Sequence, residues 1–235
     1  MPGLNKYMFY FTGTRKPNFK DIKKIDYDDY WKERGFSINK KLKEREQIMF
    51  SAIPKGSRVL DVGCGNSLLP IVLKNNGCLV SVADISDIVL NEFKKLSIGT
   101  VNIDLDKISE QKISDEYDYI ILSEVLEHTR NPEEILLTLA PHTKYFFLTI
   151  PNSAFYRYRL HLFFFGRFFT QWVYHPSEHL RYWSHIDFID WVKALGFEVV
   201  WAESSNGLSF FGLPLLKWFP NLFGHQICYL VKKIK

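Results

Sequence analysis

Cysteine is scarce in this sequence of 235 residues. The three cysteines, Cys64, Cys78 and Cys228, are odd in number and lie far apart. Their spacing fits neither a structural zinc site nor a disulfide framework. We therefore expect the protein to work in a reducing compartment.

The sequence also lacks long apolar runs and strong charge. No apolar run approaches the length of a membrane-spanning helix, and the first eleven residues are too short and mixed for a signal peptide. The net charge is only +4, and the basic residues are scattered apart from Lys232, Lys233 and Lys235. A nucleic-acid-binding face typically needs a basic cluster. These absences predict a cytoplasmic protein that binds no nucleic acid.

Aromatic residues, by contrast, are abundant. The chain has 20 Phe, 12 Tyr and 6 Trp, and they concentrate after Asn152. Residues 155–172 are dense in Phe, Tyr, Trp and Arg without a clean amphipathic stripe, so this segment is either fully covered or an exposed apolar patch.

The most informative stretch is residues 58–67, R-V-L-D-V-G-C-G-N-S. Its first five residues are apolar and β-branched, which predicts a buried parallel strand. A glycine turn, Gly63 to Gly65, and a predicted helix over residues 68–74 follow. Strand, glycine turn and helix form a layout that lets a ligand approach the backbone closely.

A dinucleotide-binding domain is the main alternative. Its G-x-G-x-x-G fingerprint needs a third glycine where this chain has Leu68. Asp84, after the apolar run 79–83, suits ribose hydroxyls in either class of protein. Asp61 discriminates, because a carboxylate beside the glycine turn repels a pyrophosphate but suits an ammonium group.

The D-V-G-C-G run at residues 61–65 resembles motif I of the class I S-adenosylmethionine-dependent methyltransferases. The resemblance covers residues 57–151 without a gap in the order of elements. It implies S-adenosylmethionine as cofactor, with Asp61 near the ammonium, Asp84 on the ribose hydroxyls, and Asp104 on the adenine amino group. The implied cofactor-binding residues are Asp61, Gly63, Cys64, Gly65, Asp84, Ile85, Asp104, Leu105 and Ser123.

From residue 58 onward, apolar strand patterns alternate with helical ones. This alternation predicts an α/β fold with a doubly wound, mostly parallel sheet. The resemblance adds a Rossmann-like sheet of seven strands closed by an antiparallel hairpin, with the aromatic insertion after strand five. We expect a leader and helices over residues 1–56, including an irregular stretch to residue 24 and an amphipathic helix at 39–53. A methyltransferase domain then spans 57–235, with a lid-like insertion at about 153–185 and an apolar loop at 207–223.

A second block, S-E-V-L-E-H at residues 123–128, follows the fourth predicted strand. It resembles methyltransferases of this broad type, including the quinone-precursor O-methyltransferases. Three roles stay open: Glu124, Glu127 and His128 as ligands of a divalent cation, His128 as a general base, or a purely structural block of helix caps. We expect no required metal ion.

A third block, residues 174–183, carries His175, Glu178, His179 and Arg181 among aromatic residues. In the family it resembles, this stretch faces the substrate side of the cofactor. His179 is the first candidate for a base, with His128 and His175 behind it. Arg181 suits either an anion or a structural carboxylate.

Together these patterns predict an enzyme that methylates a small-molecule acceptor, most readily at oxygen. The alternative is a cofactor-binding protein whose aromatic insertion docks on a partner protein or a membrane surface. The insertion itself is predicted to form a lid over the pocket or to pack on a partner.

Overall fold

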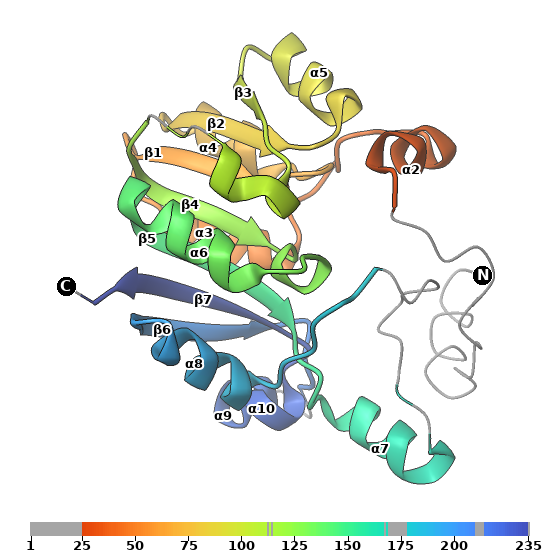
Figure 1. Cartoon of the computed structure of the whole chain (residues 1–235). Helices are drawn as coiled ribbons and strands as arrows, with labels where there is room; N and C mark the ends of the chain where they lie inside the picture. The colour runs from red at the N-terminus through yellow and green to blue at the C-terminus, as the bar shows by residue number, and fades with distance from the viewer. Residues whose placement is uncertain are drawn as a thin grey trace.

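The computed structural model describes residues 25–111, 113, 115–166, 168, 178–209 and 214–234 (Figure 1). The leader predicted over residues 1–24 and the candidate base His175 lie outside these residues.

The core of the fold is one mixed sheet of seven strands in the order β3-β2-β1-β4-β5-β7-β6. Strands β1 to β5 run parallel, and β7 is antiparallel to both β5 and β6. This confirms the predicted Rossmann-like fold with its closing hairpin. The strands are β1 (Arg58–Val62), β2 (Leu79–Asp84), β3 (Gly99–Asn102), β4 (Tyr117–Ser123), β5 (Thr143–Pro151), β6 (Phe197–Ser205) and β7 (Gln226–Lys233).

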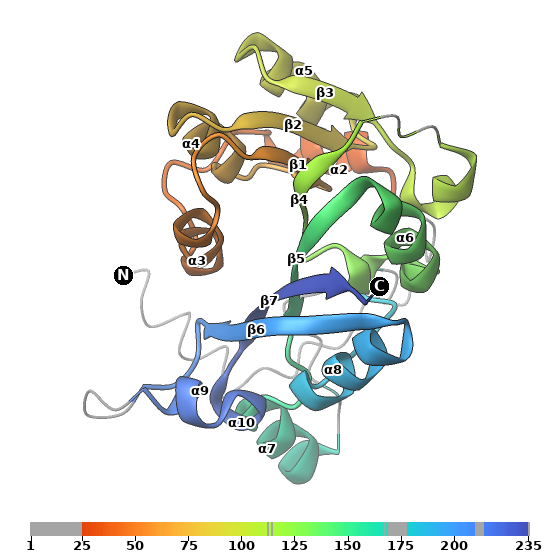
Figure 2. The same ribbon diagram turned by 90° about the vertical axis from the view of Figure 1, so that its left-hand side faces the viewer.

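Helices cover both faces of the sheet (Figure 2). One face packs under α3 (Glu44–Ala52), α4 (Leu69–Asn75) and α5 (Asp87–Lys95), and the other under α6 (Pro132–Leu139) and α8 (His185–Ala194). Alternate residues of a strand point to opposite faces, so a strand buried on both sides must be apolar at nearly every position. In β1, Val59 and Leu60 are both buried, one in each of the two main clusters.

Two predicted segments differ from the structure. The helix expected over residues 39–53 begins only at Glu44. The Asn39 amide instead donates to the Asn66 carbonyl oxygen, which ties the preceding residues to the turn after β1. The stretch 207–223, expected as a loop, contains two short helices among its described residues, α9 (Leu215–Trp218) and α10 (Pro220–Phe223).

The aromatic insertion begins with α7 (Tyr156–Phe165), which projects from the body of the molecule beside α10 in both views (Figures 1 and 2). Gly166 ends this helix in a left-handed conformation, with φ of 62°. Among the described residues, every helix is too short or too polar to cross a membrane.

Candidate active site

The glycine turn after β1 is closely packed on both of its glycines. Gly63 and Gly65 have φ of 66° and 48°, in the left-handed region that favours glycine. A Cβ on Gly63 would lie 2.7 Å from a methyl group of Val125, and one on Gly65 would lie 3.2 Å from the indole of Trp31. Both positions therefore require glycine, and the bare backbone forms part of a cavity wall.

Asp84 ends β2 next to this turn. One carboxylate oxygen accepts from the Gly65 amide at 3.0 Å, and the other accepts from the Ser86 amide at 3.0 Å. Burial raises the pKa of Asp84, and these two amides partly offset the rise. Each carboxylate oxygen accepts up to two hydrogen bonds, so the group keeps acceptor capacity toward the cavity.

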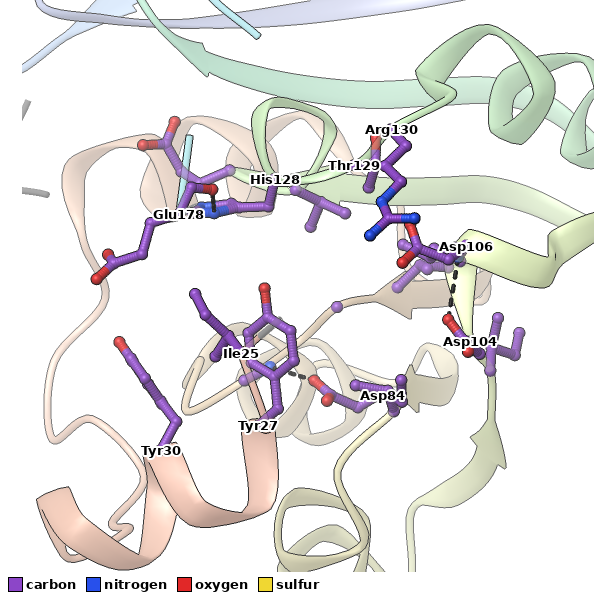
Figure 3. Close-up of a pocket in the computed structure, with 18 of the residues that line it drawn as sticks. Ile25, Tyr27, Tyr30, Asp84, Asp104, Asp106, His128, Thr129, Arg130 and Glu178 are labelled. Atoms are coloured by element: carbon purple, nitrogen blue, oxygen red, sulfur yellow. Dashed lines mark hydrogen bonds between the residues drawn. The ribbon is translucent and has the colours of Figure 1, made fainter. Parts of the chain in front are cut away.

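A cavity of about 510 Å³ lies at the carboxyl ends of β1, β2 and β4 (Figure 3). In open parallel sheets this edge is where ligands bind, at the point where the strand order reverses. The predicted residues that line it are Gly63, Gly65, Asp84, Ile85, Asp104, Leu105 and His128. The structure thus brings most of the implied cofactor residues to one place. Asp104 also caps the turn after β3, because its carboxylate accepts from the Asp106 amide at 3.0 Å.

Three other predicted cofactor residues do not line this cavity. Asp61 is 3% exposed and lies behind the turn toward Glu46 and Asp84; burial and these two carboxylates raise its pKa well above its usual range. Cys64 is buried, with its sulfur 4.0 Å from Asp84 Oδ2. The Ser123 hydroxyl contacts other protein side chains.

One wall of the cavity was not predicted from the sequence. Helix α2 (Tyr27–Arg34) contributes Tyr27, Tyr30 and Trp31 to the lining of the cavity. Tyr27 and Tyr30 lie across the cavity from His128 and Glu178 (Figure 3). The signal was present, since positions 27, 30 and 31 share one helical face. Burial, followed by the charge of Asp84, raises the pKa of Tyr27 to about 12. Its phenol therefore stays protonated and able to donate.

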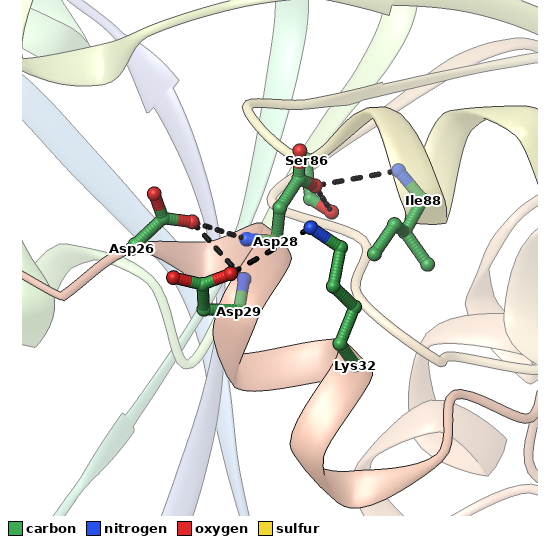
Figure 4. Close-up of polar contacts among 6 residues, drawn as sticks. All are labelled: Asp26, Asp28, Asp29, Lys32, Ser86 and Ile88. Carbon is green, nitrogen blue, oxygen red and sulfur yellow. Dashed lines mark hydrogen bonds and ion pairs between the residues drawn. The ribbon is translucent and has the colours of Figure 1, made fainter.

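Helix α2 is held in place by Asp28 (Figure 4). Its carboxylate accepts from the Ser86 hydroxyl at 2.5 Å and from the Ile88 amide at 3.4 Å, at the start of α5. The neighbouring Asp29 side chain forms only an exposed ion pair with Lys32, at 3.6 Å. Asp28 therefore supplies the polar contacts between α2 and the start of α5, and Trp31 adds apolar packing against the cluster beneath α5.

The far end of the cavity is formed by residues of two predicted blocks, 123–128 and the described part of 174–183. Backbone hydrogen bonds join the two blocks. The carbonyl oxygen of Glu127 accepts from the amides of Leu180 and Arg181, at 2.7 and 3.2 Å. The Arg181 guanidinium donates to the Arg130 carbonyl oxygen at 2.7 Å. Arg181 thus ties this segment to a backbone carbonyl group, whereas the sequence suggested an anion or a carboxylate as its partner.

Of the predicted catalytic histidines, His128 lines the cavity and His179 packs behind it. Their rings meet edge to face with centroids 4.7 Å apart. His128 Nδ1 contacts the Glu178 carbonyl oxygen, which can only accept, so Nδ1 carries the proton and Nε2 is the free base. Burial lowers the pKa of His128, and burial followed by His128 lowers that of His179 to about 3. Both rings are therefore neutral near pH 7.

Glu127 lies beside the two histidines and is 1% exposed. Neither carboxylate oxygen has a hydrogen-bond partner among the described residues. Burial, and then the charge of Glu124, raises its pKa well above its usual range. Ligand atoms of Glu127, His128 and His179 lie within 4.8 Å of one another, so these three could hold a divalent ion.

Glu124 also lines the cavity, but its carboxylate is bonded to the sheet. It is a non-glycine residue with φ of 57°, and its carboxylate accepts from Thr149 at 3.2 Å and from Gln226 at 2.7 Å. These bonds to β5 and β7 hold a backbone conformation that costs energy for a side-chain-bearing residue. The donor set that the structure assembles therefore includes His179 in place of Glu124.

A family model described as a methyltransferase domain matches residues 30–202, well over half of the chain. The chain belongs to this family of methyltransferase domains, which confirms the predicted family.

Individual relatives agree. The ubiquinone biosynthesis O-methyltransferase of Coxiella burnetii is 33% identical over 109 residues, covering 42% of this chain and 46% of that protein. The chain thus spans about half the length of the curated relatives it matches. A TehB-like S-adenosylmethionine-dependent methyltransferase from Corynebacterium glutamicum has a TM-score of 0.56 at 16% identity, covering 88% of this chain and 96% of that one. The magnesium protoporphyrin IX methyltransferase from Synechocystis, solved with bound S-adenosylhomocysteine, has a TM-score of 0.54 at 16% identity, covering 81% and 80%. These two likenesses show the shared fold.

Proposed function

We propose that the protein transfers a methyl group from S-adenosylmethionine to a hydroxyl of a small-molecule acceptor. The observation that carries this proposal is the cavity at the carboxyl ends of β1, β2 and β4, where Gly63, Gly65 and Asp84 meet. The family match supports methyl transfer, and the relative from Coxiella burnetii supports oxygen as the acceptor atom. Nothing in these comparisons supports the alternative of a protein that only docks.

The residues of the cavity fit this cofactor. Asp84 keeps acceptor capacity for two neighbouring hydroxyls, and the tight turn of Gly63 and Gly65 leaves backbone exposed where side chains would block it. Ile85, 37% exposed at the cavity, offers an apolar surface to a flat ring. When bound, the cofactor supplies an electrophilic methyl group on a sulfonium. The chain therefore needs to supply orientation and a place for the acceptor's proton.

We assign the proton to His128. Of the predicted bases among the described residues, His128 is the one that lines the cavity. Its Nε2 is free to accept a proton, because Nδ1 donates to the Glu178 carbonyl oxygen. The sequence favoured His179 as the base, and that role stays a prediction. Its position against His128 also suits a residue that fixes the His128 ring.

Cofactor binding tests the proposal first. Removing the Asp84 carboxylate deletes one or two charge-assisted hydrogen bonds, so Asp84→Ala should weaken S-adenosylmethionine binding by about 1.5–3 kcal/mol per bond in calorimetry. Asp87→Ala is the control, because Asp87 is exposed three residues away and does not line the cavity. Unchanged affinity in a folded Asp84→Ala protein would remove this assignment. A screen of hydroxylated metabolites for release of S-adenosylhomocysteine then identifies the acceptor class.

Several further assignments remain predictions. We expect methyl transfer without a required metal ion; activity lost in chelator and restored by magnesium would contradict this. The lid also stays a prediction: no described residue of α7 lines the cavity, whereas Glu178 and Leu180, at the end of the insertion, do. The cytoplasmic location and the absence of a nucleic-acid partner are likewise predictions.

A further inference from the structure

Helix α7 exposes an unusual amount of aromatic surface. Phe163 is 80% exposed, Phe164 68% and Phe168 81%, and neighbouring Leu160, Leu162 and Phe165 are exposed as well. The opposite side of the helix is anchored, because Tyr158 and His161 are buried. A contiguous apolar patch of this kind is uncommon on a protein that meets only water.

The first turn of α7 packs against a second segment of the chain that also exposes aromatic side chains. The Tyr158 hydroxyl contacts His225 Nε2 at 2.6 Å, and the Arg159 guanidinium donates to the Asn221 carbonyl oxygen at 3.2 Å. Through these contacts α7 lies against α10, and exposed Trp218 and Phe219 sit where α9 meets α10. We call the exposed side chains of Leu160, Leu162, Phe163, Phe164, Phe165 and Phe168, together with Trp218 and Phe219, the α7 patch.

Charge distinguishes this part of the chain from the rest. The sequence carries 26 acidic residues, yet none lies between residues 135 and 177 or between 204 and 235. These two stretches contain the whole α7 patch. Basic residues are retained there, including Arg157 and Arg159 on α7 and Lys217 on α9, the last paired with Glu203 at 3.3 Å. The patch is therefore aromatic, bordered by cations and free of carboxylates of its own.

We propose that the α7 patch docks the protein on an anionic lipid surface. Phe and Leu side chains gain free energy by entering the boundary between headgroups and acyl chains, and Trp is favoured at that depth. Arginines beside them are attracted to anionic headgroups, whereas carboxylates would be repelled. Two separate stretches that meet at one surface contain no acidic residue, and this composition suits an anionic lipid surface. The inference does not rest on the proposed methyl transfer, because it concerns a surface outside the cavity.

Vesicle co-sedimentation tests the proposal with the full chain. Wild-type protein should bind vesicles that contain phosphatidylglycerol, bind phosphatidylcholine vesicles more weakly, and lose binding as salt screens the arginines. Phe163→Ser/Phe164→Ser should lower the partition coefficient tenfold or more. Leu79→Ser/Leu137→Ser is the matched control, since these leucines are 66% and 44% exposed outside the patch and should leave binding unchanged. Circular dichroism and thermal unfolding verify that both double variants fold.

Three outcomes would overturn the proposal. One is equal binding by the Phe163→Ser/Phe164→Ser protein and the wild type. Another is equal binding to neutral and anionic vesicles. The third is a wild-type oligomer that the same substitutions convert to a monomer without any change in vesicle binding, which would make the patch a protein–protein contact.

Discussion

In the proposed reaction, the protonation state of His128 decides whether this residue can act as the base. The imidazole is neutral near pH 7 because burial lowers its pKa below 6.5, so its Nε2 can accept a proton. As pH falls through that lowered pKa, the ring becomes protonated and can no longer act as a base. We expect kcat/KM to be flat at neutral pH and to fall only on the acid side.

Replacing the two neighbouring histidines separates their roles. His128→Gln should lower kcat about 10²–10⁴-fold and remove the acid limb of the pH profile, while cofactor affinity is retained. His179→Gln should lower kcat less and keep the limb, because His179 acts through the His128 ring. Single-turnover methyl transfer across pH, with calorimetric cofactor binding alongside, measures both. The reverse order of losses would return the role of base to His179.

Glu127 provides a test that does not depend on catalysis. Its raised pKa means that the folded protein keeps a proton which the unfolded chain has released, so stability falls as pH rises above the ordinary carboxyl range. The slope is about 1.4 kcal/mol per pH unit until the folded pKa is reached. Glu127→Gln should remove this slope in urea unfolding, so the variant gains relative stability with rising pH. Exposed Glu110→Gln serves as control.

The opposite trend for Glu127→Gln would have a clear meaning. A variant that loses stability relative to wild type as pH rises shows an ionised carboxylate held by a cation. The cation would then be a protonated histidine or a divalent ion bound with His128 and His179. With either cation, this trend would contradict a neutral Glu127 side chain.

At the scale of elements, the position of helix α2 at the site depends on its contacts with the start of α5. Asp28→Ala removes both bonds to α5 and should weaken that docking by about 1–3 kcal/mol. Cofactor affinity should then fall severalfold, and the amides of α2 should exchange hydrogen faster. Asp29→Ala, which removes only the exposed pair with Lys32, should change neither. Equal effects of the two substitutions would contradict a docking role for Asp28.

Sequence patterns predicted elements better than the contacts between them. The strands were predictable because continuous apolar runs such as residues 58–62 are bounded by turn residues, and the glycine turn followed from Gly63 and Gly65. The start of α3 was not, because Asn39 pairs with Asn66, 27 positions away. The contact of α2 with the glycine turn could not be predicted either, because it depends on long-range packing.

The same distinction holds within the candidate site. Residues that directly follow strands β1 and β2, such as Gly63 and Ile85, were placed at the cavity by their position in the chain alone. Asp61 was not, because adjacent strand residues face opposite sides of the sheet. Val62 lines the cavity, whereas Asp61, one position earlier, does not. Side-chain direction in the loop 178–183 likewise needed the folded structure.

At the scale of the whole molecule, one amide side chain joins the parallel sheet to the segments that follow it. Asn152, just after β5, is fully buried. Its Nδ2 donates to the carbonyl oxygens of Pro220, Asn221 and Gly224, at 3.2, 3.1 and 2.8 Å. Its Oδ1 accepts from the amides of Ala154 and His185, at 3.0 and 3.2 Å. Asn152 therefore ties the start of α8, the approach to α7 and helix α10 to the end of β5.

Substituting Asn152 tests this dependence. Asn152→Asp places a second acceptor against three carbonyl oxygens and removes the side-chain donor that they share, so we expect a loss of roughly 3 kcal/mol or more in the free energy of unfolding, the range for breaking a buried polar network. Asn131→Ala is the control, because Asn131 precedes α6 without any side-chain cap and should change stability little. Urea unfolding followed by both circular dichroism and tryptophan fluorescence measures the two variants. Stability unchanged in Asn152→Asp would mean that α8 and α10 are held to the sheet by apolar packing alone.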